Sequence, residues 1–225
     1  MKQPELLGNP TDLQLQWLPA TLVSYPQHHN LEDHPGEAMP YIIGTTIYLR
    51  DYRMEDLDSI YQWRNLEEIT RTLPSYVWPE SLDQTRSFLE AQVKNTDPNN
   101  RKFAICSNQD NRYLGHIGYE YLNLRHRNTE LGIVLGNPEE LSKGIGTEAI
   151  QLFLKVCFDE MGLHRVGLKV LHTNERGIRC YQKCGFREEG AFREWAYMFK
   201  QWHHLMIMGI LENEYRALSN KESSC

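Results

Sequence analysis

Residues 141–149 have the sequence Leu141-Ser142-Lys143-Gly144-Ile145-Gly146-Thr147-Glu148-Ala149, in which two glycines open a long apolar helix. The residues before this stretch, Thr129 to Leu135, have the pattern of a strand. A strand that leads through a glycine-rich turn into a helix leaves backbone N–H groups unpaired, and the helix dipole adds positive charge there. Because glycine lets an anion approach the backbone, the stretch predicts a phosphate or pyrophosphate site. The alternative is an ordinary strand-to-helix turn.

The spacing of the glycines excludes two common phosphate sites. The chain has no GxxxxGK[ST] motif of a nucleoside-triphosphate loop and no GxGxxG motif that opens a dinucleotide-binding unit. The periodicity of the residues that follow predicts a helix over 144–161, a strand over 164–171 and a second helix from Asn174 to Gly185. Asn174 is the expected N-cap of that second helix.

Two motifs, in this order and at this separation, resemble the GCN5-related N-acetyltransferase (GNAT) superfamily. They are the turn at 143–149 and the segment Asn174-Glu-Arg-Gly-Ile-Arg-Cys-Tyr-Gln-Lys-Cys-Gly-Phe186. Upstream, Tyr61-Gln-Trp-Arg-Asn65 and Pro79-Glu-Ser-Leu-Asp83 resemble the branch that holds ribosomal-protein N-terminal acetyltransferases and spermidine acetyltransferases.

The resemblance covers roughly residues 45–215 and has two departures. Leu141 stands where the superfamily often has Gln or Arg, and Trp202-His203-His204 occupies a region where an Asp often precedes the last strand. The resemblance implies acetyl-CoA as the cofactor.

The expected fold is one α/β domain over residues 44–216, with a mixed, mostly antiparallel twisted sheet and helices on both faces. The expected order of elements is β-α-α-β-β-β-α-β-α-β-β. Residues 1–43 hold six of the ten prolines and five acids against one base, so they form a separate arm. This arm packs on its own domain or on a second subunit of a homodimer, or else it is a partly disordered leader. Residues 217–225 are expected to form a tail.

The composition limits the partners and the compartment. The 225 residues include 24 basic and 30 acidic ones, a net charge of −6, which argues against nucleic-acid binding and suits a cationic acceptor. No apolar run approaches the ~20 residues of a membrane helix, and we expect neither membrane association nor a signal peptide. Five scattered cysteines favour a reducing, cytoplasmic setting. Cys180 and Cys184 share a helix face, but no second pair accompanies them, so we expect no metal site.

The expected cofactor contacts come mainly from the backbone. The N–H groups of residues 142–147 would hold the pyrophosphate, and the resemblance implies that the pantetheine arm lies along the strand at 132–135. An N–H near Val134 would donate to the oxyanion that forms on the thioester. Asn174 would bind the cofactor or a nearby water. The cofactor-binding residues predicted in this way are Ile133, Val134, Leu135, Ser142, Lys143, Gly144, Ile145, Gly146, Thr147 and Asn174.

Acetyl transfer to an amine needs a base and an acid. A free alkylamine has a pKa near 10, so about one molecule in a thousand is neutral at pH 7 and a carboxylate must accept its proton. Glu130, at the start of the strand beside the cofactor, is the first candidate and Glu120 the second; each is otherwise a solvated strand acid. The resemblance points to Tyr181 as the acid that protonates the leaving thiolate; the alternative is a core tyrosine.

The acceptor is expected between the first two helices and the later strands, because aromatic faces suit a cation or an alkyl arm. The predicted function is transfer of acetyl from acetyl-CoA to a primary amine by direct attack in a ternary complex. The acceptor is a protein N-terminus or a small amine such as a polyamine or an aminoglycoside. A non-catalytic acyl-CoA sensor or scaffold is the alternative. The candidate acceptor-binding residues are Trp63, Tyr76, Trp78, Tyr119, Glu120 and Tyr121.

Overall fold

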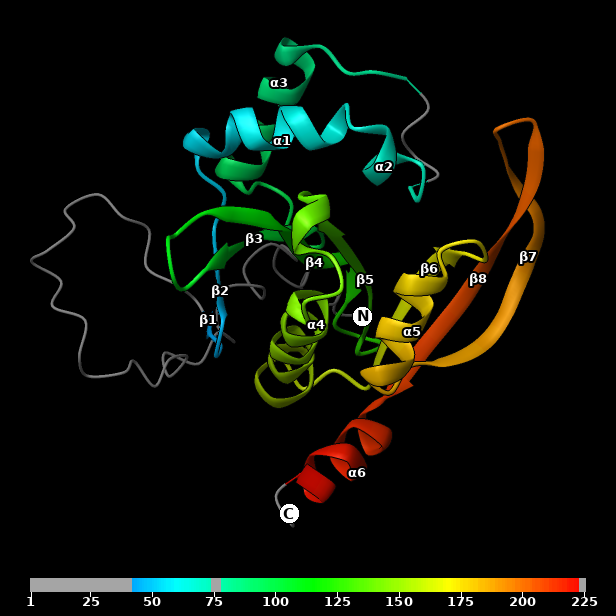
Figure 1. The fold of residues 1–225 in the computed structure, drawn as a ribbon. Coiled ribbons are helices and arrows are strands. Elements are labelled where there is room, and N and C mark those ends of the chain that lie inside the picture. Colours follow the sequence, from blue (N-terminus) through cyan, green and yellow to red (C-terminus); the bar gives the residue numbers. More distant parts are fainter. Residues whose placement is uncertain (1–41, 74–77, 223–225) are drawn as a thin grey trace, which may run out of the picture. The chain divides into compact units, whose positions relative to one another are not determined.

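The structure is a computed structural model that describes residues 42–73 and 78–222 (Figure 1). Its centre is one mixed sheet in the order β1-β2-β3-β4-β5-β6-β8-β7, in which only β5 and β6 pair in parallel. The predicted mixed, mostly antiparallel sheet is confirmed. The strands are β1 (Ile42–Ile43), β2 (Ile47–Arg50), β3 (Arg101–Ser107), β4 (Tyr113–Asn123), β5 (Asn128–Leu135), β6 (Arg165–Leu171), β7 (Arg187–Met198) and β8 (Gln201–Leu211).

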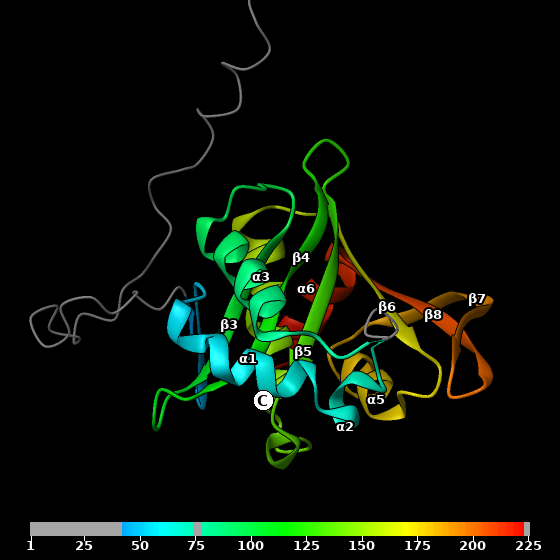
Figure 2. The ribbon, with the colours of Figure 1, turned by 90° about the horizontal axis from the view of Figure 1, so that it is seen from above.

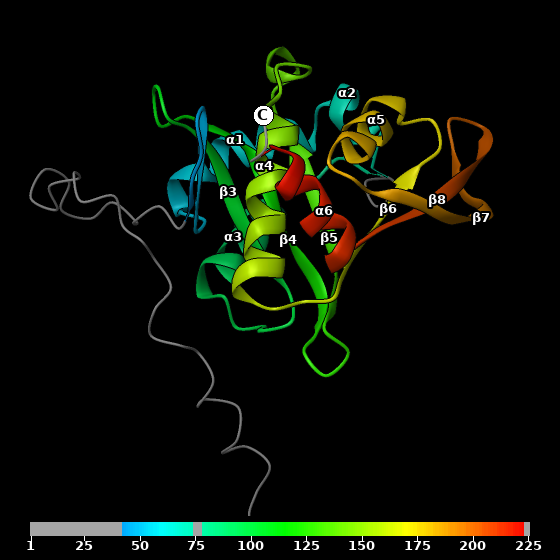
Figure 3. The same ribbon diagram turned by 90° about the horizontal axis from the view of Figure 1, so that it is seen from below.

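Helices cover both faces of the sheet, as predicted. Figure 2 shows α1 and α3 in front of the sheet, and Figure 3 shows α4 and α6 in front of the opposite face. The helices are α1 (Leu57–Arg64), α2 (Glu67–Thr70), α3 (Leu82–Lys94), α4 (Ile145–Lys155), α5 (Glu175–Lys183) and α6 (Glu212–Glu222). The expected domain end at residue 216 falls inside α6, and the expected arm contributes Ile42 and Ile43 to the sheet.

The largest difference from the predicted elements is the hairpin of β7 and β8. The sequence pattern after the second motif predicts a strand over 186–191, whereas β7 continues to Met198. Cross-strand pairs such as Phe192 with Leu205 and Tyr197 with Trp202 extend the hairpin. Two register shifts in β7 interrupt the alternation of apolar and polar residues, so the sequence pattern hides the full length of the strand. The helix predicted over 144–161 also ends early, because Val156–Glu160 form a π-helical segment.

Each face of the sheet has its own apolar core, because successive side chains of a strand point to opposite faces. Ile150 and Phe153 of α4 pack on one face, and Ile60 and Trp63 of α1 pack on the other. Trp63 lies against the backbone just after β5: a Cβ atom at Gly136 would come within 2.8 Å of its Cδ1 atom. The absence of a side chain at Gly136 therefore lets α1 sit over the end of β5.

The feature that positions the site is the divergence of β5 from β6. These two strands pair at only three positions, the last being Glu130 with Gly167. Beyond that point β5 stays paired with β4 up to Leu135, and β6 stays paired with β8 up to Leu171. Within the described part of the chain, one edge of β5 from residue 131 to 135 therefore has no strand partner. Five residues of extended chain at this edge span roughly 13 Å, the scale of an added peptide-like arm.

Candidate active site

The unpartnered edge of β5 offers backbone groups in a defined order. The N–H of Gly136, just after β5, donates to the Leu114 carbonyl at 2.8 Å, so even-numbered residues of β5 direct their backbone groups toward β4. The alternation turns the N–H and C=O of Ile133 and Leu135 to the open side, as expected for an arm that binds like an added strand. The N–H of Val134 points instead toward its register partner His116. The expected oxyanion donor is therefore not available at Val134, because that N–H faces the sheet.

The glycine-rich turn places a second set of backbone donors at the end of this edge. Gly144 is the N-cap of α4 with φ of 90°, a left-handed conformation that favours glycine. The first hydrogen bond of the helix runs from the Glu148 N–H to the Gly144 carbonyl at 3.0 Å. The N–H groups of Ile145, Gly146 and Thr147 precede it and have no acceptor within α4. We call these three groups the α4 mouth; they can hold a diphosphate, to which the helix dipole adds attraction.

Two residues of the turn contribute through conformation and charge. Ser142 also has a left-handed backbone, with φ of 65°. The Lys143 ammonium lies 3.3 Å from the Glu140 carboxylate, which also accepts from Arg112 at 3.1 Å. The predicted role of residues 142 and 143 rests on their backbone, and the structure directs the Lys143 side chain to Glu140.

Tyr181 lies on α5, next to α4, and is 9% exposed. Its ring meets Phe186 edge to face with centroids 6.0 Å apart. Burial, followed by the nearby Cys180 and Cys184, raises the pKa of the Tyr181 phenol well above its usual value near 10. The phenol therefore keeps its proton over the physiological range and is available as a donor. Tyr181 also packs in the core on the α4 side of the sheet, which was the alternative role considered for this residue.

Asn174 is the N-cap of α5, as predicted. Its Oδ1 atom accepts the N–H of Gly177 at 3.0 Å. A Cβ atom at Gly177 would come within 2.8 Å of the Asn174 side chain, so the cap and the glycine fit each other closely. This arrangement fixes the start of α5, the helix that carries Tyr181.

The two candidate bases are neighbours on the face that α1 and α3 cover. Glu120 of β4 and Glu130 of β5 are register partners. The Lys169 ammonium of β6 lies 2.9 Å and 2.8 Å from the two carboxylate oxygens of Glu130. The Lys102 ammonium of β3 lies 3.2 Å from the Glu120 carboxylate. A row of two carboxylates flanked by two ammonium groups thus crosses four strands, with Glu130 at the point where β5 and β6 diverge.

Sequence reasoning missed both lysines of this row. Lys169 lies at an exposed position of β6, a strand in which apolar residues alternate with others. The alternation predicts the face of the sheet on which the Lys169 side chain lies, but it does not predict that Glu130 is its partner. The partner follows only from the parallel register, in which Glu130 pairs with Gly167, two residues before Lys169.

The aromatic candidates do not form one cluster. Tyr121 is 66% exposed, its ring centroid is 5.9 Å from the Lys169 ammonium, and it lines a hollow together with Glu130. Tyr119 packs on the opposite, α4 side of the sheet and donates to the Pro98 carbonyl at 3.4 Å. Trp63 is 2% exposed and belongs to the core under α1. Of the aromatic candidates with described side chains, only Tyr121 lies beside Glu130.

Two other aromatic predictions have different outcomes. Trp78 is 80% exposed and so contributes nothing to a core. Tyr76 lies outside the described residues.

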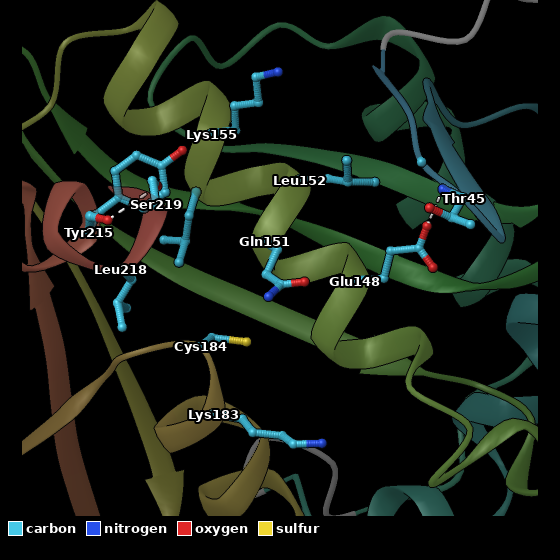
Figure 4. A pocket seen from close by; sticks show the side chains of 12 residues that line it. Thr45, Glu148, Gln151, Leu152, Lys155, Lys183, Cys184, Tyr215, Leu218 and Ser219 are labelled. Atoms are coloured by element: carbon cyan, nitrogen blue, oxygen red, sulfur yellow. Dashed lines mark hydrogen bonds between the residues drawn. The ribbon is translucent and has the colours of Figure 1, made fainter. Parts of the chain in front are cut away.

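A second hollow runs along α4 toward α5 and α6 (Figure 4). Glu148, Gln151 and Lys155 of α4 line one side, and Lys183 and Cys184 line another. Glu148 closes the end near the first strands, because its carboxylate accepts the N–H of Thr46 at 2.9 Å.

Over residues 42–73 and 78–222, no group of three or more His, Cys, Asp or Glu side chains is placed to hold a metal ion. In the same part of the chain, no helix combines the length and the apolar character needed to span a bilayer.

Comparisons with known proteins agree with this geometry. The family model of the acetyltransferase (GNAT) domain matches residues 46–187. The uncharacterized N-acetyltransferase YnaD of Bacillus subtilis (strain 168) is 27% identical over 175 residues, which cover 78% of this chain and 99% of the relative. The spermidine N(1)-acetyltransferase of Vibrio cholerae serotype O1 is 25% identical, with 77% and 97% coverage. A crystal structure of spermidine N-acetyltransferase from Vibrio cholerae in complex with CoA and spermine matches with a TM-score of 0.68 at 25% identity, covering 77% of this chain and 99% of that one.

Proposed function

The chain belongs to the GNAT acetyltransferase family, and from this premise we propose that it acetylates the primary amine of a small molecule by direct attack in a ternary complex with acetyl-CoA. The observation that carries the proposal is a pair of backbone donor sets that no sheet or helix hydrogen bond among the described residues uses. One set lies on the open edge of β5 at Ile133 and Leu135, and the other is the α4 mouth.

The residues present fit acetyl-CoA, which supplies an acetyl group activated as a thioester. The α4 mouth and the turn at 142–144 would hold the diphosphate, since their N–H groups point out of the helix start. The backbone of Ile133 and Leu135 would hold the extended arm. The N–H of Ile133, an odd-numbered residue on the open side of β5, is the proposed oxyanion donor in place of the Val134 N–H.

Glu130 is the proposed base. It lies where β5 and β6 diverge, on the face opposite α4, and a hollow lined by Tyr121 and Lys169 opens beside it. Its carboxylate would accept a proton from the incoming ammonium, directly or through a water. Lys169 holds that carboxylate in one orientation, and Tyr181 is the proposed donor to the departing thiolate.

The small-amine acceptor is supported by relatives from Vibrio cholerae and Escherichia coli that are named for spermidine, and by the exposed face of Tyr121. A protein N-terminus remains the competing acceptor. Lys169 and Lys102 already pair with the two carboxylates of the acceptor face, so this face offers little unpaired negative charge to a polycation.

An acceptor screen tests the proposal. Acetyl-CoA is incubated with the full chain and, in separate reactions, with polyamines, aminoglycosides, amino acids and short peptides, and thiol release is recorded. We expect release with at least one small primary amine and none with its N-acetylated form. Release with peptides alone would move the acceptor to protein N-termini. Tight acetyl-CoA binding in calorimetry without release for any amine would support the sensor or scaffold.

A further inference from the structure

Cys180 is a sulfur-bearing side chain that the proposed reaction does not use, although it lies against the α4 mouth. Its Sγ atom is 3.4 Å from the Thr147 hydroxyl. The position of a Cβ atom at Gly146 would be 3.6 Å from the same sulfur. Cys184, one turn further along, has its Sγ atom 3.7 Å from the Thr147 carbonyl. The two thiols of α5 therefore meet the first turn of α4, and Figure 4 shows Cys184 beside that helix.

The surroundings of Cys180 stabilise a thiolate. A hydrogen bond from the Cys184 thiol is the largest cause, followed in the same direction by the Thr147 hydroxyl and the Lys183 ammonium, while burial opposes them. Together they lower the pKa of the Cys180 thiol to about 6. The start of a helix adds attraction for a thiolate.

The other described cysteines differ from Cys180. Cys106 and Cys157 are fully buried, and burial raises the pKa of both thiols. The pKa of the Cys184 thiol is also raised, because its proton is shared with Cys180. Cys180 is half-buried, so a small reagent can reach it. Thiolate character and access coincide at this one sulfur among the residues that the structure describes.

We propose that Cys180 is a modification site for small thiol-directed electrophiles, and that its modification and acetyl-CoA binding exclude each other. The second half rests on the proposed function, because a diphosphate at the α4 mouth and a group on the Cys180 sulfur would both lie against Gly146 and Thr147. A group added to the sulfur would occupy space beside these two residues. A bound diphosphate would cover the sulfur and, as a like charge, disfavour its thiolate.

The covalent step is an ordinary substitution. With iodoacetamide as the probe, the Cys180 sulfur attacks the methylene carbon, a C–S bond forms, the C–I bond breaks and iodide leaves. The product is a neutral thioether, so the turn loses a thiolate and gains an acetamide group. A disulfide with Cys184 is not part of the proposal, because residues four apart on a helix hold their Cβ atoms further apart than a relaxed disulfide needs.

The size of the effect depends on pH. A larger fraction of Cys180 than of an ordinary cysteine of pKa about 8.5 is present as thiolate, which raises its rate of alkylation. A thiolate of lower pKa is also a weaker nucleophile, which lowers that rate. At pH 7 the two effects leave an advantage of only about threefold, whereas at pH 6 it is roughly tenfold. The experiment is therefore run at pH 6 and extended from pH 5 to 9.

The test labels the full chain with iodoacetamide and maps the sites by mass spectrometry. We expect Cys180 to react about tenfold faster at pH 6 than the cysteine of an unstructured peptide, whose pKa is about 8.5, with a midpoint near pH 6. Cys184→Ala removes the main hydrogen-bond donor and moves the midpoint upward. A midpoint near 8.5 in the wild type, or slower reaction than the peptide cysteine at pH 6, would overturn the reactive thiol.

The second arm tests mutual exclusion. Saturating acetyl-CoA should slow labelling of Cys180 at least tenfold, and labelled wild type should lose acetyl-CoA binding in calorimetry relative to its own untreated sample. Cys180→Ser, treated in the same way, should keep the binding that it has before treatment. Unchanged labelling in the presence of bound acetyl-CoA would overturn the exclusion. Untreated protein that binds no acetyl-CoA would instead end the proposed function, and the labelling rates would still decide the reactivity of Cys180.

Discussion

Lys169 and Glu130 face each other across β6 and β5, with the Lys169 ammonium 2.8 Å and 2.9 Å from the two carboxylate oxygens. The contact lies at the last paired position before the two strands diverge. It means that the proposed base is held by a cation from the strand on the far side of the cofactor gap. The arrangement makes Glu130 both a member of an ion pair and a carboxylate at the start of the gap between β5 and β6.

Replacing the proposed base should affect chemistry and spare cofactor binding. For Glu130→Gln we expect kcat to fall about 100-fold at pH 7, with the acetyl-CoA dissociation constant unchanged, because the amide cannot accept the proton. The deficit should shrink as pH approaches the pKa of the amine. The matched control is Glu120→Gln, its register partner in β4. If kcat falls strongly in Glu120→Gln and only slightly in Glu130→Gln, Glu120 is the base instead.

Removing the cation of the pair should act through Glu130. Lys169→Met removes the ammonium that orients the Glu130 carboxylate. We expect kcat to fall about tenfold while acetyl-CoA affinity stays the same. Lys169→Arg should recover part of the loss. Lys102→Met breaks the equivalent pair with Glu120 and serves as the control for a general change of surface charge. Equal losses from both methionine variants would show that the Lys169–Glu130 contact has no special role.

Tyr181→Phe tests the proposed acid without changing the shape of the core. The ring that packs on Phe186 is retained, so stability should change by less than about 1 kcal/mol. Turnover should fall more than acetyl-CoA affinity, measured by steady-state kinetics and calorimetry. Because burial raises the pKa of the phenol, activity should not decline between pH 8 and 10 through loss of this proton. Turnover that stays within about a factor of two would leave Tyr181 a core residue only.

Gly144→Val tests the turn, and the chain supplies a close control. Gly144 and Gly162 both have left-handed backbones, with φ of 90° and 61°, and a Cβ atom at either position meets no atom within 4 Å. Both valine variants should therefore lose a similar 1–3 kcal/mol of stability from backbone strain. Only Gly144→Val should also weaken acetyl-CoA binding, by tenfold or more in a calorimetric titration. Unchanged affinity in a folded Gly144→Val protein would count against the turn as the diphosphate site.

Much of the fold could be predicted because local patterns agree with the tertiary structure. The glycines at 144 and 146 mark the start of α4, and Asn174 caps α5 as its residue type suggests. The three successive strands of the expected order β-β-β are present as β3, β4 and β5, and they pair antiparallel.

The acceptor side was less predictable, because it depends on register and irregular backbone. In an unbroken strand Tyr119 and Tyr121 would share one face of β4. The register shift after Glu120 and the positive φ of Tyr121 turn the second ring to the face of Glu130 instead. The direction of the Val134 N–H likewise depends on which residues of β4 it opposes. Neither the bulge nor the register has a local signal in the sequence. The predicted set of acceptor-binding aromatic residues was therefore too large, and the contact of Lys169 with Glu130 was missed.

A crystal structure of the full chain with CoA would show where the cofactor binds. We expect the diphosphate on the N–H groups of Ile145, Gly146 and Thr147, with the arm hydrogen-bonded to the backbone of Ile133 and Leu135. CoA bound elsewhere, or an α4 mouth filled by the protein's own chain while CoA is bound, would contradict this expectation.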